Sequence, residues 1–222
     1  MSLGKEMLDY YSYEGEFIGS MEKKEMHEKM RKEFFKKGKV SVRHKHVRLL
    51  LMTTNGRLIL QRRSSLKGDN KGLWDKSVGG HVTAGESFDL SMLKECAEEL
   101  GIPSTIVKEE EFDRAVSVTD LQVLGILKRL TYFDNNQSVR GSPKQGKWTE
   151  PNMLQLYIGY YDGHIKFIDK EACGIQIYGI EELEKEIKRN PNEFTEDIKY
   201  MVKKFKHLIK PAPKKVEHVL ND

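Results

Sequence analysis

The sequence predicts an α/β or α+β domain with a mixed β-sheet, and three features of the chain support this fold class. Strand-like apolar runs recur, segments with helical periodicity lie between and after them, and an Asn-Gly pair joins two of the strands. With 222 residues, 38% of them hydrophobic and 32% charged, the chain is long enough for one large domain with a well-buried core.

The N-terminal part is expected to form an extension, residues 1–46, packed on the core. Residues 10–18 resemble a short hairpin that turns at Glu14-Gly15, and residues 20–37 are rich in lysine and glutamate with methionines near helical spacing. These patterns predict a hairpin followed by a surface helix.

The clearest hairpin of the chain follows this extension. Residues 47–54 and 57–63 read as strands, and Asn55-Gly56 between them is the pair that a type I′ turn prefers, because both central residues need positive φ. Residues 64–73 are polar and predict a loop, and residues 74–81 predict a short strand ending in two glycines.

A helix is predicted next, from about Ser87 to Leu100, stopped by Gly101 and Pro103. The polar, basic stretch 134–150 predicts a long functional loop. Further strands are expected at 121–127, 128–133, 153–161 and 174–178, and further helices at 180–188 and 196–209. The main domain would then span residues 47–210, with a disordered tail at 211–222.

Composition limits the classes of function. A net charge of +4, from 38 basic and 34 acidic residues, is mild and argues against a nucleic acid polymer as partner. No apolar run approaches the roughly 20 residues that span a bilayer. Cys96 and Cys173 are far apart and predict reduced structural thiols, so we expect a cytoplasmic protein without a membrane partner. A homodimer is compatible with the sequence.

The segment from Gly80 to Ile102 carries the chemistry. On a helix at about 100° per residue, Glu95, Glu98 and Glu99 fall on one side as a carboxylate cluster, opposite a buried stripe of Leu90, Leu93, Ala97 and Leu100. Like charges at this spacing repel each other, and a hard divalent cation reverses the sign of that interaction. A solvated acidic face is the alternative for three glutamates alone, and Glu86 with the glycine turn before it weakens that alternative.

This segment resembles the Nudix box, Gly-x5-Glu-x7-Arg-Glu-U-x-Glu-Glu-x-Gly-U with U apolar. It matches every fixed polar or glycine position but one, at Gly80, Glu86, Glu95, Glu98, Glu99 and Gly101. The departure is Lys94, which stands where the family has arginine. Lysine cannot hold a carboxylate bidentately, which puts the orientation of the glutamates and the rate in doubt.

The resemblance implies a Nudix-type α/β/α sandwich with a mixed sheet, and a hydrolase that cleaves a diphosphate linkage in a small molecule. It implies Mg²⁺, or Mn²⁺ in its place, held by Glu95, Glu98 and Glu99 near the backbone of Gly79 or Gly80. Glu86 would support the loop or a second metal shell. One glutamate would serve as base, and Lys94 would orient the catalytic group.

Flanking motifs resemble the Nudix branch that includes isopentenyl diphosphate isomerase. They cover about residues 14–205 and comprise Gly15-Glu-Phe-Ile-Gly19, Met26-His27, Leu60-Gln61-Arg62-Arg63, Trp74 to His81, and Asn190 to Thr195. The isomerases carry a catalytic cysteine where this chain has Gly79, and a Glu-x-Glu pair where it reads Glu150-Pro151-Asn152. They also lack most of the box acids. These differences favour hydrolysis.

The same resemblance suggests further site residues. His81 resembles a metal ligand of the isomerases, and a hydrogen-bonding loop histidine is the alternative. Arg63 and Lys67 match positions that hold the diphosphate, and Trp74 matches an aromatic pocket wall, with core packing as the alternative. Basic residues of the long loop would gather phosphate or stay solvated: Arg140, Lys144 and Lys147. A charged surface turn is expected at Glu109–Glu111.

Three hypotheses of function remain. The first is a Nudix diphosphohydrolase acting on a nucleoside diphosphate derivative or a similar compound. The second is an isomerase-like enzyme on an isoprenoid diphosphate, disfavoured by Gly79 and Asn152. The third is a non-catalytic module that binds a diphosphate metabolite, supported by Lys94 alone, and magnesium-dependent turnover would exclude it.

Overall fold

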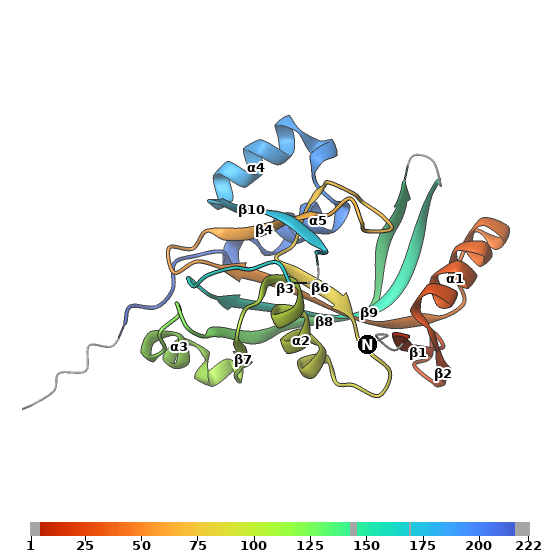
Figure 1. Cartoon of the computed structure of the whole chain (residues 1–222), viewed down its shortest axis with the longest axis horizontal. Coiled ribbons are helices and arrows are strands. Elements are labelled where there is room, and N and C mark those ends of the chain that lie inside the picture. Colours follow the sequence, from red (N-terminus) through yellow and green to blue (C-terminus); the bar gives the residue numbers. More distant parts are fainter. Residues whose placement is uncertain (1–4, 143–145, 169, 216–222) are drawn as a thin grey trace, which may run out of the picture.

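A mixed, curled β-sheet with helices on both faces forms the protein in a computed structural model, which describes residues 5–142, 146–168 and 170–215 (Figure 1). The strands run in the order β10-β4-β3-β9-β8-β7, with β1 and β6 pairing on β3, β5 on β4, and β2 on β1. Their bounds are β1 Met7–Tyr11, β2 Phe17–Glu22, β3 Arg43–Met52, β4 Leu58–Arg63, β5 Trp74–Asp75, β6 Val78–His81, β7 Ser104–Ile106, β8 Gly125–Ser142, β9 Gly146–Tyr160 and β10 Ala172–Tyr178.

The sheet is mixed because β3 runs parallel to β9 and β7 parallel to β8, whereas the other pairs are antiparallel. The helices connect and cover these strands. They are α1 Lys23–Lys37, α2 Phe88–Leu100, α3 Glu109–Val118, α4 Ile180–Arg189 and α5 Glu196–Phe205, with short 3-10 turns at Pro191–Glu193 and Lys206–Leu208.

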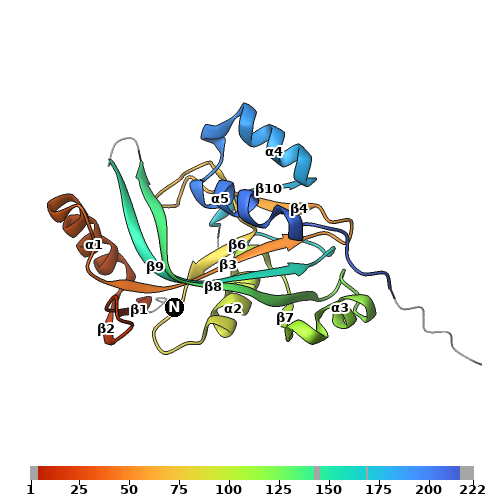
Figure 2. The ribbon, with the colours of Figure 1, turned by 180° about the vertical axis from the view of Figure 1, so that it is seen from behind.

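Two apolar clusters, one on each face of the sheet, account for the sandwich (Figures 1 and 2). On one face, Met92, Cys96 and Leu100 of α2 pack on strands β3, β4 and β9. On the other face, side chains of α3, α4 and α5 pack on the opposite side of the sheet. The buried strands alternate between the two clusters because successive side chains point to opposite faces. The predicted α/β class with a mixed sheet is therefore confirmed.

A third cluster joins the N-terminal segment to the sheet. Leu8, Met26, Met30 and Val40 pack around Trp148 of β9, so that α1 lies beside the hairpin of β8 and β9 (Figure 1). The predicted N-terminal hairpin and helix are present as β1, β2 and α1. The division into 1–46, 47–210 and 211–222 stays a prediction.

The long loop predicted for residues 134–150 is wrong. Strands β8 and β9 continue through this stretch and pair antiparallel up to Ser142 and Gly146. The stretch has the polar composition of a loop because its side chains face water or a polar cavity. Its backbone N–H and C=O groups nevertheless form hydrogen bonds between β8 and β9. Lys144 lies outside the described residues, and Lys147 is exposed.

Other predicted elements also change. Glu109–Glu111 form the first turn of α3 rather than a surface turn, where acidic side chains favour the positive end of the helix dipole. The predicted strand at 74–81 is two strands, β5 and β6, separated by Lys76 and Ser77. The predicted strand at 121–127 begins only at Gly125, and β7 was not foreseen.

The predicted tail begins later than expected. The backbone N–H of Ala212 donates to the carbonyl of Thr54, and Tyr160 Oη donates to the carbonyl of Lys210. Residues 216–222, the rest of the predicted disordered tail, lie outside the described part of the chain. Among the helices that the structure describes, none is long and apolar enough to cross a membrane.

Candidate metal-binding and active site

Helix α2 carries the predicted carboxylates and is fixed at both ends. Ser87 Oγ accepts a hydrogen bond from the N–H of Leu90 at 3.2 Å, and Gly101 ends the helix in the left-handed region with φ 64°. The prediction of its buried stripe is wrong for two of the four residues. Leu100 is buried as predicted and Leu93 is half-buried, but Leu90 is 49% exposed and Ala97 is exposed, and Met92 and Cys96 are buried in their place.

The buried face of α2 includes a carboxylate. Glu99 is only 1% exposed, and its Oε2 accepts hydrogen bonds from Gln61 Nε2 and from the backbone N–H of Gly79, each at 3.1 Å. Burial opposes its ionisation and raises its pKa, against the opposing effect of Lys67 and of the Gly79 N–H. Glu99 is thus held against the end of β6, and the periodicity argument misplaced it by assigning every polar residue to the solvent side.

Glu95 lies one turn earlier and is pressed against Gly80. A Cβ atom on residue 80 would lie 1.7 Å from Glu95 Oε1, so only glycine leaves room for the carboxylate. Burial and the neighbouring Glu99 raise the pKa of Glu95 to about 8. Two carboxylates side by side, one buried and one half-buried, are unfavourable unless a proton or a cation lies between them, and oxygen ligands of this kind suit Mg²⁺.

The remaining residues of the box lie around this pair. Glu98 is exposed and, like Glu95, lines a cavity of about 980 Å³. Lys94 Nζ contacts Glu86 Oε1 at 2.7 Å, and Ser91 Oγ donates to Glu86 Oε2 at 3.1 Å. Lys94 therefore binds Glu86, which ties the loop before the helix to the helix itself.

The three residues predicted to bind the substrate, Lys67, Arg63 and Trp74, lie in different surroundings. Lys67 lies in the cavity wall, 3.9 Å from Glu99 Oε1 and paired with Glu171, and burial lowers its pKa to about 8. Arg63 also lines the cavity but is bound to Asp69 and Asp75. Trp74 is not among the described lining residues. It packs against the first core cluster and faces Arg62, which favours core packing over a pocket wall.

A cluster of histidines lies in the same cavity. His27 of α1, His44 of β3, His81 of β6 and Glu150 of β9 each offer a ligand atom, and these atoms lie within 4.8 Å of one another. His81 therefore lies at the end of strand β6 and within this cluster, rather than in a loop. His46 adjoins the cluster, with its ring centroid 4.4 Å from that of His81.

The electrostatics of this cluster fit a cation. Burial lowers the pKa of His44, His46 and His81, so the imidazoles are neutral and their lone pairs are available. Burial also opposes ionisation of Glu150, but Arg140 and the neighbouring histidines outweigh it and hold the pKa of Glu150 well below its usual value. Glu150 Oε1 lies 3.0 Å from His27 Nε2 and 3.1 Å from His44 Nε2. Two buried ring nitrogens of the cluster, His44 Nδ1 and His81 Nε2, form no hydrogen bond with any described residue. Convergent imidazole and carboxylate groups with such free atoms suit a transition metal.

The sequence held a signal for this cluster. His44 and His46 alternate on one strand, so both point to the same face of β3. His46 pairs in register with His81 of β6, and His44 with Asn152 of β9, two residues from Glu150. The pairing of β3 with two distant strands brings the residues together, and this register was not readable from the sequence.

The structure also shows the surroundings of Gly79 and Asn152, the two positions at which this chain differs from the isomerases. A Cβ on residue 79 would lie 2.5 Å from Lys76 Cε, so a cysteine at this place would require Lys76 to move. Asn152 is fully buried; its Oδ1 accepts from Asn136 and its Nδ2 donates to Ser138 and to the carbonyl of Glu150. Neither residue has a group that titrates.

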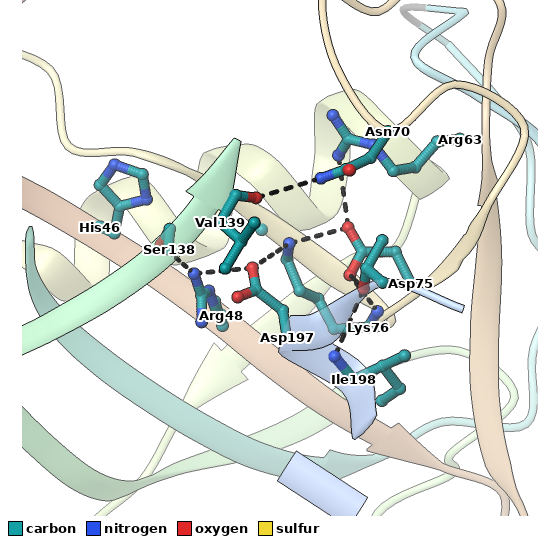
Figure 3. Close-up of polar contacts among 12 residues, drawn as sticks. His46, Arg48, Arg63, Asn70, Asp75, Lys76, Ser138, Val139, Asp197 and Ile198 are labelled. Carbon is teal, nitrogen blue, oxygen red and sulfur yellow. Dashed lines mark hydrogen bonds and ion pairs between the residues drawn. The ribbon is translucent and has the colours of Figure 1, made fainter. Parts of the chain in front are cut away.

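Arg140 belongs to a buried arrangement of ion pairs. It contacts Glu150 at 2.6 Å and Asp69 at 2.9 Å, and both partners raise its pKa against the effect of burial. It therefore neither stays solvated nor offers an unpaired charge to phosphate. A second group of ion pairs is formed by Arg48, Lys76, Asp75 and Asp197 (Figure 3), and all of these but Asp75 line the cavity.

Comparison with known proteins identifies the family to which this protein belongs. A sequence model of the Nudix domain matches residues 42–198, well over half of the chain. The protein therefore belongs to the Nudix family, as the resemblance predicted.

Particular relatives add detail to this assignment. An isopentenyl-diphosphate Delta-isomerase of Serratia proteamaculans is 24% identical over 190 residues, which cover 86% of each protein. An uncharacterised Nudix hydrolase of Pseudomonas aeruginosa is 41% identical over 61 residues, or 28% of this chain and 36% of that protein. The crystal structure of DR0079 from Deinococcus radiodurans has a TM-score of 0.61 at 21% identity, covering 89% of this chain and 98% of that one, which shows the same fold.

Proposed function

We propose that the protein is a hydrolase that cleaves a diphosphate linkage in a small molecule with the help of Mg²⁺ or Mn²⁺. One observation carries the proposal: the half-buried Glu95 and the buried Glu99 lie side by side against Gly80 and Gly79, with Glu98 of the same helix at the cavity wall. Keeping two carboxylates with raised pKa values in this position costs stability, and a divalent cation offsets that cost.

Each residue of the site has a role in the proposed reaction. Glu95, Glu98 and Glu99 would hold the metal, with the backbone of Gly79 and Gly80 close by. When bound, the metal would neutralise the diphosphate oxygens and activate water. Lys67 would contact the substrate phosphate, and one of the glutamates would accept the proton of the attacking water. Glu86 and Lys94 would hold the loop that precedes the helix.

The first test compares Glu98→Gln with the parent protein. Glu98 is exposed on α2, so the variant should fold normally while Mg²⁺-dependent release of phosphate from a panel of diphosphates is lost. Glu99→Gln should lose activity as well, and its folding must be measured because Glu99 is buried. If both variants keep most of the activity and fold normally, the metal site is assigned wrongly.

We further propose that His27, His44, His81 and Glu150 hold a second metal ion, of the transition series. Its support is the convergence of these ligand atoms, together with the two buried ring nitrogens, His44 Nδ1 and His81 Nε2, that form no hydrogen bond with any described residue. Metal analysis of the protein after dialysis should find about one transition metal ion per chain in the parent and much less in His81→Ala. Equal metal content in the two proteins would contradict this site.

Isomerisation of an isoprenoid diphosphate is the second candidate, favoured by the likeness to the Serratia isomerase over most of the chain. The local structure opposes it, since Lys76 fills the space beside Gly79 and Asn152 is used in buried hydrogen bonds. A cytoplasmic location, a homodimer and the division into domains stay predictions.

A further inference from the structure

Gln61 is a polar side chain at a core position of strand β4. Along this strand, Ile59 packs in the apolar cluster on the α2 face of the sheet, whereas Leu58 and Leu60 pack in the cluster on the other face. Alternation places Gln61 on the same face as Ile59, and Gln61 is only 3% exposed. An apolar residue would suit this position, so packing alone does not explain a glutamine.

The side-chain amide of Gln61 joins strand β4 to helix α2. Its Nε2 donates to Oε2 of Glu99 at 3.1 Å, and the same oxygen accepts a hydrogen bond from the backbone N–H of Gly79, also at 3.1 Å. Two donors from different strands, β4 and β6, therefore fix one oxygen of the Glu99 carboxylate.

The other oxygen of Glu99 lies beside a residue of the cavity wall. Glu99 Oε1 is 3.9 Å from Nζ of Lys67, which lines the cavity. With Oε2 bound by Gln61 and Gly79, Oε1 is the oxygen that is left to coordinate a cation. A carboxylate that is already fixed by its neighbours loses little freedom when it binds a metal, which favours binding.

The carbonyl oxygen of the same amide is not used in this way. Gln61 Oε1 is buried and forms no hydrogen bond with any described residue. A buried carbonyl without a partner costs free energy. Since half of the amide is unsatisfied, the contact of the other half with Glu99 is what accounts for a glutamine at this position.

A neutral donor suits a metal ligand better than a charged one. A lysine or an arginine at position 61 could also bind Glu99, but its positive charge would repel a cation held by the same carboxylate. Gln61 fixes the direction of the carboxylate without adding charge. Residues that orient a metal ligand from behind typically change the affinity for the metal by about 10- to 100-fold.

We infer that Gln61 is a positioning residue of the proposed metal site, which holds Oε2 of Glu99 so that Oε1 serves as the metal ligand. This inference rests on the proposed function, because it takes Glu99 as a ligand of Mg²⁺. It assigns to Gln61 an effect on the affinity for the metal, while contacts with the substrate belong to residues of the cavity wall.

The affinity for Mg²⁺ without substrate, measured by calorimetry, tests this role. Gln61→Met keeps the length and approximate shape of the side chain but removes the donor, so it should bind Mg²⁺ at least about tenfold more weakly than the parent protein. Unchanged affinity in the folded variant would overturn the inference and leave the proposed function intact. Absence of Mg²⁺ binding in the parent protein would contradict the proposed function, and the inference with it.

The matched control is Gln155→Met. Gln155 of β9 is also a buried glutamine, 6% exposed, but its Nε2 donates to the backbone carbonyls of Thr131 and Leu156. This variant should keep the Mg²⁺ affinity of the parent protein. An equal loss in both variants would mean that removing any buried glutamine loosens the site, which would contradict a specific role of Gln61.

A shorter side chain provides a second variant at the same position. Gln61→Asn keeps an amide, but its side chain is one methylene too short to reach Glu99, so the loss of Mg²⁺ affinity should be similar to that of Gln61→Met. It replaces Gln61→Met in every comparison if that variant does not fold. Parent-like affinity in folded Gln61→Asn would contradict the inference.

A double variant shows whether Gln61 acts through Glu99. Glu99→Gln alone should lose most of the Mg²⁺ affinity, and adding Gln61→Met should change the remaining affinity by less than about twofold, because the partner of Gln61 is already altered. A further loss of about tenfold would place the effect of Gln61 elsewhere and overturn the inference.

Turnover provides an independent measurement. The Mg²⁺ concentration that gives the half-maximal rate should rise about tenfold in Gln61→Met. The KM for a diphosphate substrate at saturating Mg²⁺ should stay unchanged, because the role of Gln61 is to hold Glu99 and not the substrate. A raised KM with an unchanged dependence on Mg²⁺ would indicate a role in substrate binding and overturn the inference.

Discussion

The Nζ atom of Lys94 lies 2.7 Å from Oε1 of Glu86, which joins the helix of the box to the loop before it. This hydrogen bond and the charge of Glu86 raise the pKa of Lys94 against the opposing effect of burial. Lys94 stands where the family has arginine, and it contacts Glu86 through a single ammonium group instead of a guanidinium.

Substitution of Lys94 tests what this contact contributes. Lys94→Arg should leave kcat unchanged or raise it, because a guanidinium can bind Glu86 through two donors. Lys94→Ala should lower kcat/KM by about tenfold, through the loss of one charge-assisted contact. Steady-state kinetics measure both. A large fall in Lys94→Arg without unfolding would show that the site is adapted to lysine.

Gly80→Ala should separate activity from folding. The new Cβ would collide with the end of the flexible Glu95 side chain, which can move aside, so the melting temperature should change little. The displaced carboxylate should cost about 100-fold in kcat. Gly174→Ala is the control, because a Cβ at that position meets Arg62 at an ordinary 3.5 Å. Normal activity of Gly80→Ala would mean that Glu95 does not act from its present position.

Glu95→Gln should weaken the stabilisation of the protein by metal. The neutral amide removes one of two adjacent carboxylates, so the melting temperature without metal should rise by a few degrees. Mg²⁺ should stabilise the parent protein, because it binds the folded state, and should stabilise this variant much less. Thermal denaturation with EDTA and with Mg²⁺ provides the comparison. Equal stabilisation of both proteins by Mg²⁺ would exclude Glu95 as a ligand.

Incubation with isopentenyl diphosphate in deuterated water distinguishes hydrolase from isomerase. Migration of the double bond needs a proton donor and a proton acceptor on opposite faces of the substrate, and neither Gly79 nor Asn152 can serve. Cys96 is no substitute, since it is fully buried and burial raises the pKa of its thiol to about 12. We expect no deuterated dimethylallyl diphosphate by mass spectrometry. Its appearance would overturn the hydrolase proposal.

The sequence predicted the parts of the site that depend on local spacing. The glycine turn and helix α2 follow from a short motif, and the structure places Glu95 and Glu99 against that turn. The prediction for α2 was wrong at Glu99, which is buried, because patterns of polar and apolar residues assign every glutamate to solvent. The proposed metal site accounts for this exception.

The parts that depend on strand pairing could not be predicted in the same way. His27, His44 and Glu150 come from three elements that meet only when β3 pairs with β9 and α1 packs on Trp148. Asp197 likewise reaches Arg48 through the docking of α5. Long-range register of this kind leaves no local signal, although the alternation of His44 and His46 was a clue.

The parallel register of β3 and β9 makes strand β9 intolerant of small insertions near Glu150. His44 pairs with Asn152, and Glu150 lies two residues earlier in the same strand, on the same face. One residue added between Glu150 and Asn152 would turn Glu150 away from the histidines, and two would restore its direction but move it by about 7 Å. Related chains that keep this histidine cluster should therefore have their insertions and deletions outside the segment of β9 from Glu150 to Asn152. Chains with an insertion or deletion inside that segment should have lost the histidines.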